Sequence, residues 1–234
     1  MTTALATKEE ARRIFVAMRA KYRALYDAVK KTHEGILAAG KTTMGHGWDH
    51  DLRVAQTDIL IAEDPRVGEM GWCVGVMHSA DRHYGEQTEE VLRGYFALLP
   101  KGEFAVEEHV MMWNALIEHS KKNSDADNPV TVALKDADRL ANLGALNLIR
   151  CGQHHPDIPA CIPEYLGRVH PESTFRNLKS CYDAISVVNL EWEAMLRLPK
   201  AKEMGKPYFD YYRDFVKRCA QEMEEVGLYP FPSE

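Results

Sequence analysis

The sequence predicts an all-α fold, and three observations support that prediction. Apolar residues recur every three to four positions through most of the chain, which is the period of an amphipathic helix. Helix-starting signals such as Thr7-Lys8-Glu9-Glu10 and Asn128-Pro129 stand where these apolar stripes begin. Alternating apolar and polar runs of the length that a strand needs are absent from the sequence. We therefore expect a helical bundle of about seven or eight helices.

The first half of the chain divides into five expected helices. Thr7 and Glu10 have the spacing of a capping box, and the stripe that follows them predicts one long helix ending at Gly40. Asp64-Pro65 ends the second helix, because the residue before a proline disfavours helical backbone. The expected helices of this half span residues 7–40, 50–63, 70–82, 88–98 and 104–119.

The second half is expected to hold three helices and one long loop. Asn128-Pro129 combines an N-cap residue with proline at the first helical position, and the helix continues to about Arg150. Four prolines interrupt residues 152–171, which predicts a loop of a length that is often functional. The last two helices are expected over residues 172–197 and 208–226. An aromatic cluster on the last helix predicts either core packing or a contact in a homo-oligomer; it comprises Tyr208, Phe209, Tyr211, Tyr212 and Phe215.

The length of the chain limits the number of domains, and its net charge limits the kind of partner that it can bind. A chain of 234 residues without internal repeats favours one large domain over residues 1–234 rather than two small ones. Lys and Arg number 29 against 35 Asp and Glu, giving a formal charge of −6. Because there is no basic excess to bind a phosphate backbone, nucleic-acid binding is disfavoured. A small molecule is the expected partner.

Cysteine usage and hydropathy predict a cytoplasmic protein. The five cysteines are odd in number and lie ten or more residues apart, which argues against a disulfide framework or a metal knuckle. The N-terminal segment lacks the apolar stretch of a signal peptide, and no run of 18 apolar residues is present. We therefore expect neither secretion nor a membrane partner.

Histidines and one aspartate sit at positions that face the core. His50 begins the apolar stripe of its helix, and His78 follows the most apolar run in the chain. Taken singly, such a histidine is more often a hydrogen-bonded core residue than a ligand. Asp138 shares a helix face with Leu134, and a buried carboxylate costs several kcal/mol unless it is compensated. It therefore needs Arg139, hydrogen bonds from other helices, or a metal ion.

Three segments in order resemble the H…HD…D signature of the HD superfamily of metal-dependent phosphohydrolases. They are His50-Asp51-Leu52-Arg53-Val54-Ala55, Gly75-Val76-Met77-His78 and Asp136-Ala137-Asp138-Arg139-Leu140. The resemblance covers residues 44–150 and implies an HD-like bundle, followed by a helical extension over residues 151–234. It also implies that His50, His78 and Asp138 hold a divalent ion, without distinguishing Mn, Mg, Co, Fe or Zn.

The chain departs from this signature after His78. Ser79 occupies the position where the family has an aspartate. One fewer carboxylate lowers the expected affinity for a hard ion such as Mg²⁺ or Mn²⁺. Asp81 offers a replacement carboxylate, because it lies three residues beyond His78 and about one helical turn along.

The function implied by the resemblance is hydrolysis of a small phosphorylated substrate such as a nucleotide. A bound metal would generate the nucleophile from water, and Asp81 or Asp136 would accept the proton. Arginine and lysine side chains near the motifs would bind phosphate oxygens. Some members of the family have extra histidines between the second and third motifs, and these contact a second metal or the substrate phosphate. The residues expected to contact substrate are Arg82, Lys121, Arg139, His109 and His119.

Two other functions stay open. A catalytically inactive HD-like protein could bind a small anion or a partner without metal, and Ser79 is the residue that favours it. The superfamily also includes diiron oxygenases, which need ligands for two irons. The common nucleotide-binding loops and the serine-hydrolase elbow are absent from the sequence.

Overall fold

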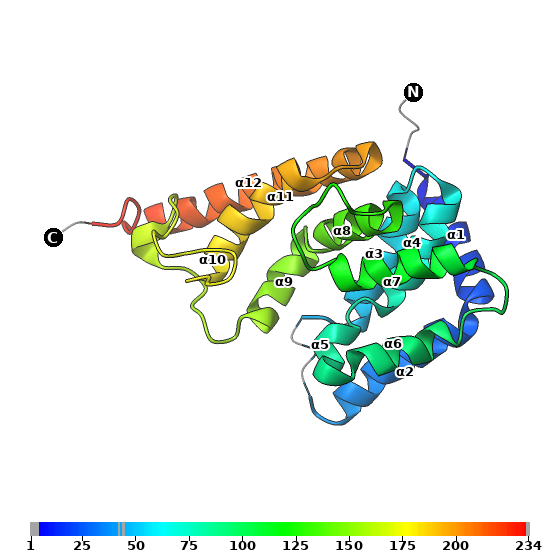
Figure 1. The fold of residues 1–234 in the computed structure, drawn as a ribbon. Coiled ribbons are helices and arrows are strands. Elements are labelled where there is room, and N and C mark those ends of the chain that lie inside the picture. The colour runs from blue at the N-terminus through cyan, green and yellow to red at the C-terminus, as the bar shows by residue number, and fades with distance from the viewer. Residues whose placement is uncertain (1–4, 42, 44, 233–234) are drawn as a thin grey trace. The chain divides into compact units, whose positions relative to one another are not determined.

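A computed structural model describes residues 5–41, 43 and 45–232, and it confirms the all-α class (Figure 1). Within these residues the only strand-like pairing is an isolated bridge between Thr174 and Asn177. None of the described helices has both the length and the apolar character needed to cross a membrane. Met44, where the expected motif region begins, lies outside the described residues.

The chain forms two compact units. The first unit comprises residues 1–141 and 197–203, and the second comprises residues 142–196 and 204–234. The single domain over residues 1–234 stays a prediction. The helices of the first unit are α1 (Lys8–Lys21), α2 (Arg23–Ala38), α3 (Trp48–Ile61), α4 (Pro65–Met77), α5 (Ala80–Tyr84), α6 (Thr88–Phe96), α7 (Val106–Glu118) and α8 (Pro129–Ala141), with the 3₁₀ turn η1 (Gly85–Gln87) between α5 and α6.

Helix α4 is the centre of the first unit. Every residue from Met70 to Met77 is buried, and α3, α7 and α8 pack around this helix. Gly75 permits the close contact with α3, because a Cβ atom at that position would lie 2.6 Å from the Cα atom of Ala55. The most apolar run of the sequence thus forms the helix that places His78.

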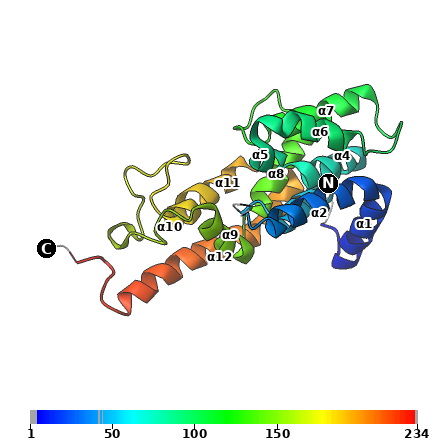
Figure 2. The same ribbon diagram turned by 90° about the horizontal axis from the view of Figure 1, so that it is seen from below.

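Three of the expected helices are divided, so the chain has more helices than expected. The helix predicted over residues 7–40 breaks at Tyr22, and Figure 2 shows α1 and α2 meeting at an angle there. The Tyr22 ring stacks on both Trp72 and Phe104, with 6.0 Å between ring centres in each pair. The helix predicted over residues 128–150 breaks at Gly144, whose φ of 83° is left-handed.

The third divided helix is the one predicted over residues 70–82. Its first part, α4, begins earlier, at Pro65, because the Asp64 side chain accepts a hydrogen bond from the Arg66 N–H and caps the helix. That part ends at Met77, and α5 starts separately at Ala80. His78 and Ser79 therefore lie between two helices.

The second unit contains α9, a long loop, one helix with a π-helical segment, and most of the final helix. The loop is longer than expected because the following helix begins only at Cys181, where the Ser180 side chain accepts a hydrogen bond from the Asp183 N–H. Of the aromatic cluster, Phe209 and Tyr212 are fully buried. The elements are α9 (Ala145–His154), η2 (Pro163–Tyr165), α10 (Cys181–Asp183), the π-helix η3 (Ala184–Asn189), α11 (Leu190–Met195) and α12 (Pro199–Glu224).

A buried carboxyl group lies between α3 and α4. Asp58 is fully buried, and neither of its oxygens has a hydrogen-bond partner among the described residues. Burial, followed by the negative charge of Asp136, holds the pKa of Asp58 well above its usual range. Gly71 leaves the space for this side chain, since a Cβ atom there would lie 1.8 Å from an Asp58 oxygen. Asp58 is therefore a neutral acid at the helix interface.

We expect Asp58→Asn to remove a pH-dependent loss of stability. In the unfolded chain an aspartate ionises near pH 4, whereas the folded chain keeps Asp58 protonated. Between those two pKa values Asp58 lowers the free energy of unfolding by about 1.4 kcal/mol for each unit of rising pH. Urea unfolding at pH 5, 6 and 7 should show the variant gaining on the wild type at each step. The same substitution at exposed Asp125 is the control, and equal trends in both variants would contradict the prediction.

Candidate metal centre

Three helices bring His50, His78 and Asp138 together. His50 lies in the first turn of α3, His78 directly follows α4, and Asp138 lies in the last turn of α8. Their ligand atoms all lie within 4.8 Å of one another. The His50 Nε2 atom is 3.2 Å from the Asp138 Oδ1 atom and 3.2 Å from the His78 Nε2 atom. The side chains singled out from the sequence thus form one cluster, of which both histidines are buried.

The orientation of the His78 ring is fixed by the backbone. Its Nδ1 atom is 2.7 Å from the carbonyl oxygen of Gly75, which can only accept a hydrogen bond. The Nδ1 atom therefore carries a proton, and the Nε2 atom lies 3.2 Å from the His50 Nε2 atom and 3.9 Å from the Asp138 Oδ1 atom. A second hydrogen bond of this kind is typical of a histidine that binds metal.

Asp138 supplies the negative charge of the cluster. Burial raises its pKa, but the hydrogen bond from His50 and the positive charge that His50, His78 and His119 can carry outweigh burial, so the net shift is downward. The cluster therefore offers two imidazole nitrogens and one ionised carboxylate. This donor set fits a divalent ion of the first transition row, because such ions accept both nitrogen and oxygen ligands.

Ser79 is tied to a carboxylate from another helix. Its hydroxyl donates a hydrogen bond of 2.5 Å to the Asp51 Oδ1 atom and lies 3.3 Å from the His78 Nε2 atom. The other Asp51 oxygen is 2.8 Å from the His33 Nε2 atom of α2. All of these side chains are buried. A carboxylate is therefore present beside position 79, although it comes from residue 51.

No site role was predicted for Asp51 or His33 from the sequence. A signal for Asp51 was available, since Asp51, Val54, Ala55 and Asp58 follow the i, i+3, i+4, i+7 pattern of one helix face, and all four are buried. His33 lies 18 residues before Asp51 in the chain and on a different helix. No local pattern of the sequence points to that contact.

Asp81 and Arg82 flank the cluster at the start of α5 without joining its ligand atoms. The Asp81 Oδ2 atom is 3.5 Å from the Arg82 Nε atom, and the Asp81 Oδ1 atom has no hydrogen-bond partner among the described residues. The Asp81 carboxylate is near enough to His119, and Arg82 to His46, to affect the pKa of each histidine. The replacement ligand expected at Asp81 is thus not among the three converging side chains.

Further histidines surround the cluster. The His119 ring centre is 5.6 Å from that of His78, and the His119 Nδ1 atom donates to the Leu116 carbonyl oxygen at 2.7 Å. Burial, and next the charge of His78, lower the pKa of His119. The His46 ring lies 5.7 Å from that of His50, and burial lowers the pKa of His46 to about 2. Both rings are neutral at physiological pH. His119 was predicted from the sequence to contact substrate, whereas no role was predicted for His46.

The structure does not bring four other expected residues to the cluster. Asp136 is fully buried and accepts hydrogen bonds from the backbone N–H groups of residues 197 and 198, so it fixes the chain there. Arg139 donates to Asn123 and Asp136. Lys121 pairs with Glu118 at the surface, and His109 packs against Phe96 and Phe104. The proton-acceptor role expected of Asp136 and the substrate contacts expected of the other three residues stay predictions.

Solved bacterial proteins have a similar fold. One from Lactobacillus plantarum, a structural genomics target, superposes with a TM-score of 0.64 at 16% identity, covering 86% of this chain and 97% of the other. YpgQ of Bacillus subtilis, solved in complex with ADP, superposes with a TM-score of 0.59 at 16% identity, covering 86% and 96%. At this identity the likeness concerns the fold alone. No protein-family model matches the chain, and no curated protein matches it.

We expect Ser79→Asp to destabilise the protein and a carboxylate exchange to restore it. The new carboxylate would meet Asp51 where the serine hydroxyl now donates, and uncompensated buried charge costs about 3–5 kcal/mol. Asp51→Ser combined with Ser79→Asp moves the single carboxylate across the same contact. The double variant should therefore recover a coupling free energy of about 1–3 kcal/mol.

Urea unfolding of the wild type, both single variants and the double variant measures this coupling. Ser79→Ala is the control for loss of the hydroxyl alone, with an expected cost of about 1–3 kcal/mol. Strict additivity of the two single changes would show that residues 51 and 79 do not interact in the folded chain.

Proposed function

We propose that this protein is a metal-dependent phosphohydrolase of the HD superfamily that acts on a small phosphorylated molecule such as a nucleotide. The observation that carries the proposal is the convergence of His50, His78 and Asp138 from α3, α4 and α8. These residue types, in this order along the chain, match three of the four residues of the superfamily's H…HD…D signature, and Ser79 stands in place of the fourth. The proposal therefore unites the sequence resemblance with the cluster that the structure contains.

Each residue of the centre has a definite task under this proposal. His50, His78 and Asp138 would hold the ion, which when bound polarises a phosphoryl oxygen and acidifies a water molecule. Ser79 donates its proton to Asp51, so the remaining lone pairs of its oxygen are available to a water molecule at the cluster. The Asp51 carboxyl group thus lies one hydrogen bond away from the centre.

Asp81 and Arg82 are the side chains best placed to handle substrate. Asp81 has an oxygen without a hydrogen-bond partner in the described part of the chain, and its charge acts on the pKa of His119. It would accept a proton from the attacking water. The Arg82 side chain is 47% exposed, which leaves its guanidinium able to bind phosphate oxygens in a two-pronged geometry.

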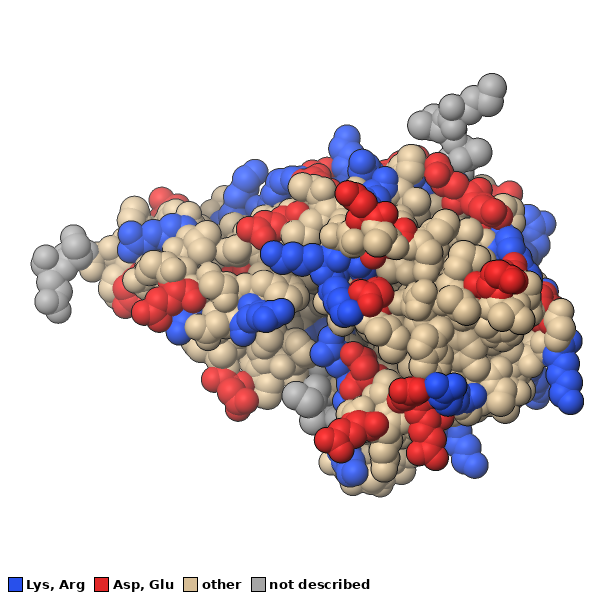
Figure 3. Space-filling model, viewed as in Figure 1, with Lys and Arg blue, Asp and Glu red and all other residues tan. Residues whose placement is uncertain are grey.

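Charge distribution favours a small substrate over a polynucleotide. On the face drawn in Figure 3, acidic and basic side chains are interspersed and form no extended basic area. The formal charge of −6 agrees with that arrangement. YpgQ, a protein of similar fold, was solved with ADP, which is itself a small phosphorylated molecule.

We also infer a cytoplasmic location. All five cysteines are free thiols, which is the usual state in a reducing compartment. Fractionation of the native host, with the protein followed by antibody, would test this location.

Purified protein should contain about one divalent ion per chain, and His50→Ala should lose it, because a ligand has been removed. Elemental analysis by mass spectrometry measures the metal content of both. His109→Ala is the matched control, since His109 lies against Phe96 and Phe104 rather than in the cluster. Wild type without metal, and with a melting temperature that Mn²⁺, Mg²⁺ and Co²⁺ leave unchanged, would favour a metal-free anion-binding protein instead.

Asp81→Asn should lower kcat by about 10²–10⁴-fold without reducing metal content, because it removes a proton acceptor and no ligand. Phosphate release from a panel of nucleotides and sugar phosphates with Mn²⁺, Mg²⁺ or Co²⁺ measures the activity. Asp125→Asn, an exposed position, serves as the control. Unchanged turnover in Asp81→Asn would remove this residue from the mechanism.

A further inference from the structure

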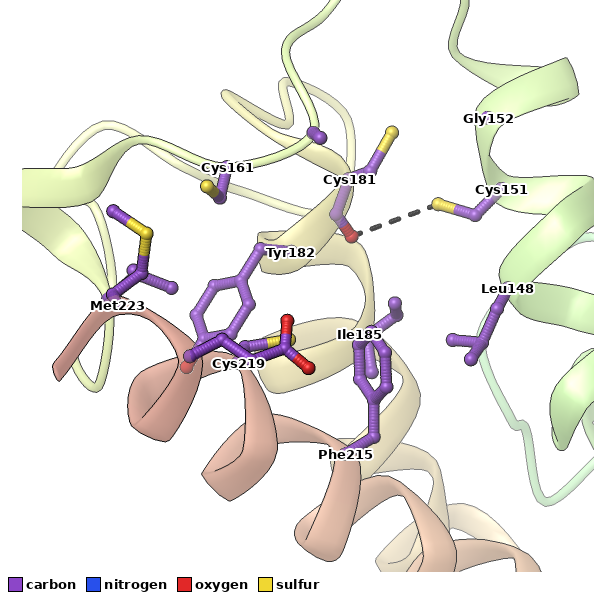
Figure 4. A pocket seen from close by; sticks show the side chains of 13 residues that line it. Leu148, Cys151, Gly152, Cys161, Cys181, Tyr182, Ile185, Phe215, Cys219 and Met223 are labelled. Carbon is purple, nitrogen blue, oxygen red and sulfur yellow. Dashed lines mark hydrogen bonds between the residues drawn. The ribbon is translucent and has the colours of Figure 1, made fainter. Parts of the chain in front are cut away.

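A cavity lies within the second unit. It has a volume of about 360 Å³ and is lined by α9, the loop that follows it, α10, η3 and α12 (Figure 4). This volume lies within the usual range of small-molecule sites, about 300–1,000 Å³. All of the lining residues belong to the second unit, so the cavity is separate from the metal centre of the first.

Four of the five cysteines of the chain line this cavity. They come from α9, the loop, α10 and α12, and they are Cys151, Cys161, Cys181 and Cys219. Burial raises the pKa of Cys151 to about 12, and burial also raises that of Cys219. These two thiols are protonated at neutral pH, so they act as small polarisable apolar groups rather than as nucleophiles.

The four thiols do not form a metal site. Among the described residues, the group of three or more metal-ligating side chains that converges is His50, His78 and Asp138. The Cys151 thiol instead lies 3.8 Å from the Cys181 carbonyl oxygen, as the dashed line in Figure 4 marks. A thiophilic cation is therefore not the ligand that this arrangement fits.

The rest of the lining is apolar and partly aromatic. The rings of Tyr182 and Phe215 and the sulfur atom of Met223 face the same space (Figure 4). The Tyr182 hydroxyl accepts a hydrogen bond from the Gly167 N–H. The one carboxylate of the lining, Glu222, is paired with Arg218 at 2.9 Å. The cavity thus offers sulfur and ring surfaces but little unpaired charge.

We propose that this cavity binds an uncharged aromatic molecule. Sulfur atoms make favourable contacts with the edges of aromatic rings, and here thiols on several sides combine with a thioether and two rings. A charged ligand would lose its hydration without gaining a counter-ion. The site does not depend on the proposed phosphohydrolase activity.

N-phenyl-1-naphthylamine is a suitable probe, because it is uncharged and aromatic and its fluorescence rises in apolar surroundings. We expect saturable binding to the full-length protein with one site per chain. Leu148→Trp should weaken binding at least about tenfold by filling the cavity. Ile149→Trp is the matched control, since Ile149 is the next residue of α9, is 67% exposed and does not line the cavity; it should bind as the wild type does.

Thiol protection gives a second readout. The probe should slow alkylation of the cavity cysteines Cys161 and Cys181 by N-ethylmaleimide in the wild type, measured by peptide mass spectrometry, and should leave their rates unchanged in Leu148→Trp. Cys219→Met fills the cavity from α12 and replaces Leu148→Trp if circular dichroism shows that variant unfolded. Absence of saturable binding, or equal affinity in filled and control variants, would overturn the proposal.

Discussion

The buried side chain of Asp51 is the constraint on which the cluster of His50, His78 and Asp138, the proposed metal centre, depends. Its two oxygens accept hydrogen bonds from Ser79 and from His33, so it connects α2, α3 and the end of α4. A buried charge requires such partners, because removing one leaves an uncompensated group in a region without water. Asp51 is adjacent in sequence to His50, and Ser79 is adjacent to His78. The hydrogen bond between 51 and 79 therefore fixes the relative position of the two imidazoles as well.

Helix α8 shows how neighbouring acidic residues acquire unrelated tasks. Successive residues of a helix are rotated by about 100°, so Asp136 and Asp138 point in widely different directions. Asp138 faces the histidines, whereas Asp136 accepts the backbone N–H groups of residues 197 and 198. Lys135, the residue before Asp136, is buried and forms an ion pair with Asp127 at 2.8 Å, which holds the loop that precedes α8. Thus α8 supplies Asp138 to the cluster and is itself anchored through Asp136 and Lys135.

Local sequence patterns were sufficient for the fold class and marked His50, His78 and Asp138 as residues that face the core, whereas their convergence was expected from the resemblance to the HD superfamily. Helical periodicity and capping signals are properties of short segments, and His50, His78 and Asp138 each stand at the edge of such a segment. The features that could not be predicted from the sequence depend on contacts between segments that are distant in the chain. Tyr22 ends α1 because its ring packs between Trp72 and Phe104. Asp58 is tolerated because α4 has a glycine opposite it. His109 lies in α7 and His119 directly follows it. The ten residues between them rotate the two side chains to different directions, so His109 contacts Phe96 whereas His119 contacts His78.

Gly75 positions the proposed metal centre in two ways through its backbone. The missing side chain lets α4 approach Ala55 of α3 closely, and the carbonyl oxygen receives the Nδ1 proton of His78. The first contact sets the separation of the two helices that carry the imidazoles, and the second selects which ring nitrogen is free. The positions of the two imidazole rings are therefore set by main-chain geometry, and thermal motion alters the main chain less than it alters side-chain rotamers. In the proposed metal site, donors held in this way would favour an ion of one size, since a larger ion would require the helices themselves to move apart.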